Sequence, residues 1–168
     1  MAGAYRRNKI SGAFAVRLIE MLESPAFQVL SRAAHQVLAR IEIEHAHHGG
    51  AENGKLPVTY DHFVEYGLHR HAIGPAIREL VALGFIEVTQ RGCARNGEFH
   101  QPSLYRLTYR DVKGTPGDGT HEWRRIKSIE EAEALAKQAR RDVDLRARAL
   151  GRARRKNKRP VAVSDKLQ

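Results

Sequence analysis

The chain has 168 residues, of which 29 are Lys or Arg and 19 are Asp or Glu, so its net charge is +10 with histidine neutral. This length suits one or two small folded units and excludes a large catalytic domain. The sequence contains no uncharged apolar run of the ~18 residues that cross a bilayer, and a single cysteine, Cys93, excludes an internal disulfide. We therefore expect a protein of the reducing cytoplasm.

The positive charge is concentrated in the C-terminal third. Residues 1–109 hold 12 basic and 10 acidic side chains, whereas residues 110–168 hold 17 and 9. Every Phe and Tyr lies in the first part, and a Gly- and Pro-rich stretch follows it. We predict a folded domain at 12–109, a linker at 110–127 and a basic helical tail at 128–168 whose end is disordered.

The first predicted elements are helices. Apolar residues at helical spacing predict a helix over 12–23. Ser24, followed by Pro25, is predicted to cap a second helix, and Ser31 a longer one that ends at Gly49-Gly50. The inward face of this longer helix is predicted to hold Ala34, Val37, Leu38, Ile41 and His45.

A short strand and two further helices come next. Residues 56–58 (LPV) predict an edge strand, because proline cannot donate to a central one. Thr59 is predicted to cap a helix that ends at Gly67. A tight turn then leads into a helix that ends at Gly84 in a Schellman motif. This helix is predicted to turn Ile73, Ile77, Leu80 and Val81 inward.

Two alternating strands finish the unit. The first carries Ile86 and Val88, and the second carries Tyr105, Leu107 and Tyr109. The loop between them spans residues 91–103. The order of elements predicts an α+β fold, mainly α with a small β-hairpin: a winged helix-turn-helix followed by a basic helix.

Three segments carry a resemblance to a known family. Residues 53–63 (NGKLPVTYDHF), 69–80 (HRHAIGPAIREL) and 83–88 (LGFIEV) resemble the winged-helix domains of plasmid and phage replication initiators and related bacterial regulators. The likeness covers roughly residues 12–109 and leaves the tail unmatched. Pro75, where this family has ordinary helix formers, removes one backbone hydrogen bond and favours a kink.

The docking geometry of such domains implies a set of DNA contacts. The second helix of the motif presents its first residues to base edges in the major groove, where an arginine such as Arg70 can bind guanine through two hydrogen bonds. The expected groove contacts are His69, Arg70, His71, Gly74 and Arg78. Two other roles stay open: His69 as a helix cap and Arg78 as the partner of a surface carboxylate.

Other expected contacts lie on the phosphate backbone. Thr59, Tyr60 and His62 open the preceding helix, whose N-terminus favours anions, although Tyr60 equally suits the core. The loop between the strands adds Arg91, Arg95 and Asn96 for the backbone or minor groove, or serves only as an exposed, charged hairpin.

Features of an enzyme are not evident in the sequence. It lacks a Walker-type loop and a nucleophile elbow. His45 and His48 share one helix face, but no spacing supplies a third metal ligand. We predict no catalysis, no metal, no cofactor and no small-molecule ligand.

The tail has helical periodicity from Ser128 and then becomes strongly basic. Its narrow, alanine-rich stripe suits packing on the domain, pairing with a second chain, or partial helicity in solution. Trp123, with its neighbouring arginines, is expected to anchor the linker, with stacking on a base as the alternative. Non-specific phosphate contacts are expected from the cluster Arg152, Arg154, Arg155, Lys156, Lys158 and Arg159.

These patterns predict a cytoplasmic, nucleoid-associated protein that binds double-stranded DNA sequence-specifically and regulates transcription, replication or a mobile element. A homodimer would use the helix at 12–23 or the one at 128–150. Two alternatives stay open: an RNA- or nucleoid-associated protein dominated by its tail, and a protein-interaction adaptor.

Overall fold

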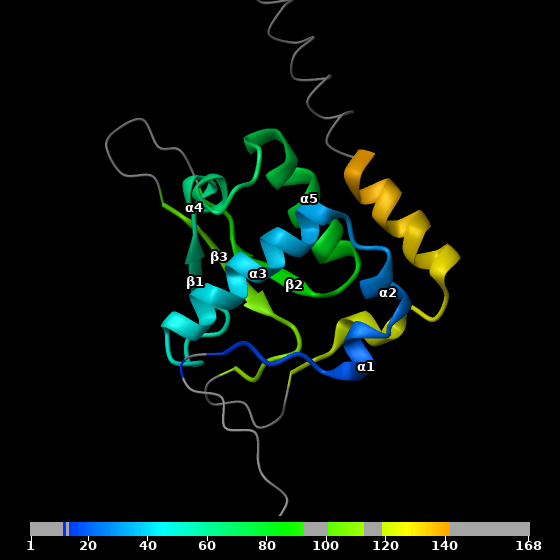
Figure 1. The fold of residues 1–168 in the computed structure, drawn as a ribbon, viewed down its shortest axis with the longest axis horizontal. Coiled ribbons are helices and arrows are strands. Elements are labelled where there is room, and N and C mark those ends of the chain that lie inside the picture. Colours follow the sequence, from blue (N-terminus) through cyan, green and yellow to red (C-terminus); the bar gives the residue numbers. More distant parts are fainter. Residues whose placement is uncertain (1–11, 13, 93–100, 113–118, 142–168) are drawn as a thin grey trace, which may run out of the picture.

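The computed structural model describes residues 12, 14–92, 101–112 and 119–141, and it has an α+β architecture (Figure 1). Helices cover one face of a small antiparallel sheet, and a further helix, called the C-terminal helix below, covers 129–141. In chain order the labelled elements are α1 (Ile19–Leu22), α2 (Pro25–Gln28), α3 (Arg32–His47), β1 (Leu56–Val58), α4 (Tyr60–Glu65), α5 (Arg70–Ala82), β2 (Ile86–Gln90), β3 (Ser103–Leu107) and the 3-10 helix η1 (Glu122–Arg125).

The sheet has three strands in the order β1-β3-β2, so the predicted short strand at 56–58 lies beside the predicted hairpin. The proline-containing strand β1 lies at an edge, as predicted, and pairs with β3 through Leu56 opposite Tyr105. Asn53 completes this edge, because its amide nitrogen donates to the Leu107 carbonyl at 2.9 Å and its amide oxygen accepts from the Leu107 N–H at 2.8 Å. The buried Asn53 amide thus bonds to the Leu107 backbone in the way that a neighbouring strand would.

Local capping chemistry sets the helix boundaries as predicted. The Ser24 hydroxyl accepts from the Phe27 N–H, and the Ser31 hydroxyl accepts from the Ala34 N–H. Gly84, at φ +78°, ends α5 in the predicted Schellman geometry. α5 is helical through Pro75. The glycine before this proline has no Cβ, which relieves the clash that normally disfavours a helical residue there.

The core lies between α3, α5 and one face of the sheet. From α3 it takes Val37, Leu38 and Ile41, as predicted, and His45 is half-buried beside them. From α5 it takes Ile73 and Leu80. The prediction for Val81 was wrong, because its side chain is 41 % exposed.

The predicted helix at 12–23 was also wrong in most of its length. Only Ile19–Leu22 is helical, and residues 14–18 have no regular secondary structure. Tertiary contacts hold this segment out of the helix that its periodicity predicts. The Arg17 guanidinium forms a bidentate ion pair with the buried carboxylate of Glu42, at 2.6 and 2.8 Å. Arg110 donates to the Val16 carbonyl oxygen. The segment therefore lies along the body as a strap.

Residues 119–127, predicted as half of a linker, pack into the core. Trp123 is 2 % exposed and Ile126 is 3 % exposed, so Trp123 is the anchor that we expected. Gly84 permits this contact, because a Cβ there would lie 2.7 Å from the backbone of Glu122. The apolar stripe of the C-terminal helix then packs on the same core through Ala132 and Ala136. Of the three arrangements considered for this stripe, the structure shows packing on the domain.

Across the described ranges, none of the helices is both long and apolar enough to cross a membrane.

Candidate nucleic-acid interface

The N-cap and the first two residues of α5 form an exposed polar surface, called the leading end below: His69, Arg70 and His71. All three side chains are exposed, while Ile73 two residues further on is fully buried. The helical period explains this division, because Ile73, Ala76 and Leu80 face the core from one side of α5. His69 occupies the N-cap position but makes no side-chain capping bond.

The two histidines of the leading end stack on each other. Their ring centroids lie 5.7 Å apart, and the ring planes differ by 12°. Arg70 lies between them in sequence and is held from the other side by α4. Its Nη1 donates to Asp61 at 2.7 Å, and its guanidinium lies 5.9 Å from the Tyr60 ring centroid. Both Arg70 and Asp61 are mostly exposed, so water screens their attraction.

The residues at the start of α4 hold that helix in place. Thr59 and His62 form a reciprocal capping box, in which the Thr59 hydroxyl accepts from the His62 N–H at 3.2 Å. Tyr60 is 40 % exposed, so it contributes to the surface more than to the core. Its hydroxyl approaches Gly74, where a Cβ would lie 3.3 Å away. Gly74 therefore allows close packing of α4 on α5.

Arg78 differs from the other candidate residues of α5. It is half-buried, and its Nε donates to the Ala139 carbonyl oxygen of the C-terminal helix at 3.0 Å. This contact belongs to the packing of the two helices.

Arg91 lies exposed just beyond β2, at the base of the loop between the strands. Pairing of Val58 with Ser103 brings the start of α4 to the same end of the sheet. Figure 1 shows α4, the start of α5 and the N-terminal end of β3 on one side of the molecule. The other predicted contacts, Arg95 and Asn96 in the loop and the cluster at 152–159, lie outside the described residues.

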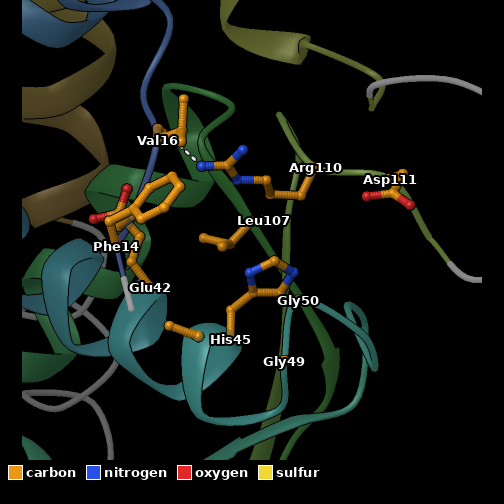
Figure 2. Close-up of a pocket in the computed structure, with 11 residues that line it drawn as sticks. Phe14, Val16, Glu42, His45, Gly49, Gly50, Leu107, Arg110 and Asp111 are labelled. Carbon is orange, nitrogen blue, oxygen red and sulfur yellow. Dashed lines mark hydrogen bonds between the residues drawn. The ribbon is translucent and has the colours of Figure 1, made fainter. Parts of the chain in front are cut away.

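A hollow of about 420 Å³ lies between the strap, the end of α3 and the chain after β3 (Figure 2). Glu42 is one of the residues that line it, and Glu42 Oε1 also accepts from the Tyr109 hydroxyl at 2.6 Å. Burial and the Glu42 charge raise the pKa of Tyr109 well above its usual value. Both Glu42 oxygens are thus bonded to side chains of this protein, namely Arg17 and Tyr109. We interpret the hollow as the gap left where the strap packs on the body.

Sequence reasoning missed two buried acids, Glu42 and Glu79. Each lies one residue from an apolar core position of its helix, which is the signal that could have marked it. Within the described residues, His, Cys, Asp and Glu side chains form no group of three or more with the placement of metal ligands.

Comparisons of this chain with protein-family models, with curated proteins and with solved structures found no match.

Proposed function

We propose that this protein is a sequence-specific binder of double-stranded DNA, with a winged helix-turn-helix whose α5 enters the major groove. One observation carries the proposal: the leading end of α5 exposes an arginine and two histidines, while Ile73, Ala76 and Leu80 of the same helix are buried in the core. A helix anchored in this way can enter a groove about 12 Å wide without losing its core contacts.

Arg70 supplies the base-reading group in this proposal. Its pairing with Asp61 is exposed, so exchanging it for a guanine edge costs little. The flanking histidines and Tyr60 supply further donors beside it. Arg91 lies at the base of the loop that would act as the wing, near the phosphate backbone. Through such binding the protein would regulate transcription, replication or a mobile element.

A mobility-shift assay with genomic fragments and excess competitor DNA tests the proposal. The full chain is expected to retain a subset of fragments, and Arg70→Ala is expected to weaken that binding about 5- to 100-fold, the equivalent of one bidentate base contact. Lys127→Ala is the matched control, because it removes one exposed charge near the opposite end of α5. Equal losses in both variants, or no preferred fragment, would contradict the proposal.

The charge distribution favours a second candidate, a nucleic-acid binder without sequence preference. The described residues hold 15 basic and 14 acidic side chains, so the other residues carry most of the net charge. In that case the basic residues beyond 141 supply most of the binding free energy, and the affinity depends on the salt concentration and not on the DNA sequence. The same assay separates the two candidates, because this one predicts that every fragment is retained equally.

A further inference from the structure

An exposed acidic side chain lies beside the arginine that is proposed to read DNA. Asp61, in the first turn of α4, accepts from Arg70 of α5 at 2.7 Å, and its side chain is 72 % exposed. The phosphates of a duplex repel this carboxylate. Asp61 therefore lowers the affinity for DNA unless a donor group of the DNA pairs with it.

The fold fixes the position of Asp61 relative to α5. Its neighbours Thr59 and His62 form the capping box at the start of α4, and the next residue, Phe63, is fully buried in the core. The helix that carries Arg70 is likewise packed on the core. Asp61 and Arg70 therefore approach a groove together, as a pair of opposite charges on two anchored helices.

Asp61 loses its partner when Arg70 binds a guanine. An ionised carboxylate has acceptor oxygens only, so it needs a donor in exchange. In the major groove, guanine and thymine present acceptors, adenine presents an acceptor beside its amino group, and cytosine presents the N4 amino group alone. Cytosine is therefore the base whose edge best fits the Asp61 carboxylate.

The geometry favours the base pair next to that guanine. A guanidinium that binds guanine through two nitrogens covers the edge of its own base pair. Successive base pairs are stacked about 3.4 Å apart, which is close to the 2.7 Å between Arg70 Nη1 and Asp61 Oδ1. The carboxylate is therefore within reach of the neighbouring pair once the two side chains part.

We propose that Asp61 is a second base-contacting residue, which selects a cytosine in the base pair adjacent to the guanine that Arg70 reads. This inference rests on the proposed function, and it narrows the target to duplexes with two adjacent G·C pairs. At other sequences the carboxylate faces acceptor atoms or phosphates, so Asp61 also weakens binding to unrelated DNA.

Selection from a random duplex library, with the full chain and its Asp61→Asn variant, tests this inference. An asparagine amide has the size of the carboxylate but both donates and accepts, which suits adenine. Asp61→Asn is expected to keep the guanine position and to replace the adjacent cytosine by adenine. Glu65→Gln is the matched control, because it removes the same charge from an exposed position of α4 and is expected to leave the motif unchanged.

Fluorescence anisotropy with two labelled duplexes, in which thymine replaces only that cytosine, measures the size of the effect. The wild-type chain is expected to bind the cytosine duplex at least about fivefold more tightly, because thymine presents an acceptor where cytosine presents its amino group. In Asp61→Ala the ratio is expected to fall below about twofold. Circular dichroism checks that each variant keeps the helix content of the wild-type chain.

Three results would overturn the inference while leaving the proposed function intact. They are a wild-type motif whose guanine has no cytosine beside it, a cytosine preference that persists in Asp61→Ala, and a joint loss of the guanine and cytosine preferences, which would make Asp61 only a support for Arg70. Failure of the wild-type chain to enrich any motif would overturn both.

Discussion

Arg70 and Arg78 lie about two turns apart on α5, yet their surroundings give them different roles. Arg70 is 67 % exposed and pairs with an exposed carboxylate, so its guanidinium exchanges partners at little cost. Arg78 is half-buried and donates to a backbone carbonyl of the C-terminal helix. Both residues follow the sequence pattern expected of a DNA-reading helix. Their roles differ because the C-terminal helix packs beside Arg78 and not beside Arg70, and the sequence did not predict where that helix packs.

Gly84 is a residue at which the backbone tolerates no side chain. Its φ is +78°, and a Cβ would meet the backbone of Glu122 and Trp123 at 2.7 and 2.8 Å. We expect Gly84→Ala to lower the free energy of unfolding by about 2–4 kcal/mol, through left-handed strain and overpacking together. The measurement is urea unfolding followed by the fluorescence of Trp123, the only tryptophan.

Gly67→Ala is the control for the Gly84 prediction. Its φ is +97°, and a Cβ there has nothing within 4 Å. This variant is expected to lose only about 1–2 kcal/mol, the cost of the left-handed backbone alone. Equal losses at Gly67 and Gly84 would show that the close approach of η1 to Gly84 does not matter for stability.

Two half-buried histidines make stability depend on pH. Burial lowers the pKa of His35, and the Arg17 charge lowers it further; burial and the Arg110 charge do the same for His45. Because the folded pKa lies below the unfolded value of 6.5, the unfolded state takes up protons first. We expect the free energy of unfolding to fall as the pH drops from 7 through about 6.5 toward the folded pKa values.

Thermal melts at pH 7, 6 and 5 measure this dependence. The variant with His35→Gln and His45→Gln is expected to have a smaller decrease in Tm over this range than the wild-type chain. His47→Gln, at an exposed position on the same helix, is the control and is expected to keep the wild-type slope. The histidine account is wrong if the double variant and the control have the same slope.

At the scale of elements, Ser31 combines two functions. It caps α3 by accepting from the Ala34 N–H at 3.2 Å, and it donates its own N–H and hydroxyl to Glu79. Ser31→Ala removes the cap and one partner of a buried carboxylate. We expect a loss of about 2–4 kcal/mol in the free energy of unfolding, measured by urea titration.

Ser128 offers the matched comparison, because it caps the C-terminal helix at 3.2 Å from the Glu131 N–H and has no buried acid beside it among the contacts described. Ser128→Ala is therefore expected to cost only about 1 kcal/mol. If Ser31→Ala costs no more than Ser128→Ala, the hydroxyl bond to Glu79 contributes nothing to stability.

The accuracy of sequence-based prediction differs between elements for a physical reason. Caps such as Ser24, Ser31 and Thr59 act on backbone groups two or three residues away, so the sequence predicts them. The strap at 14–18 depends instead on Arg17 reaching a carboxylate 25 residues away. Its apolar periodicity suggested a helix, and the distant ion pair could not be read from local spacing.

The whole molecule divides its charge unevenly. Outside the described residues, 14 basic side chains stand against 5 acidic ones, while the described body is nearly neutral. In the proposed function, non-specific affinity comes from those outer residues and selectivity from the body. The sequence predicted this division of charge and the exposed position of His69–His71. Packing of the tail helix on the domain was one of three arrangements that the sequence left open. Its contacts with Gly84 and Glu79 could not be predicted, because they join segments far apart along the chain.

Selection from a random duplex library tests the central claim most directly, namely that the leading end of α5 reads bases. The full chain and its Arg70→Ala variant are each taken through the same rounds at physiological salt, and the enriched sequences are compared. We predict one enriched motif for the wild-type chain, with a guanine position whose preference disappears in Arg70→Ala. A library that stays unenriched with the wild-type chain, or a motif that is unchanged in the variant, would contradict the account.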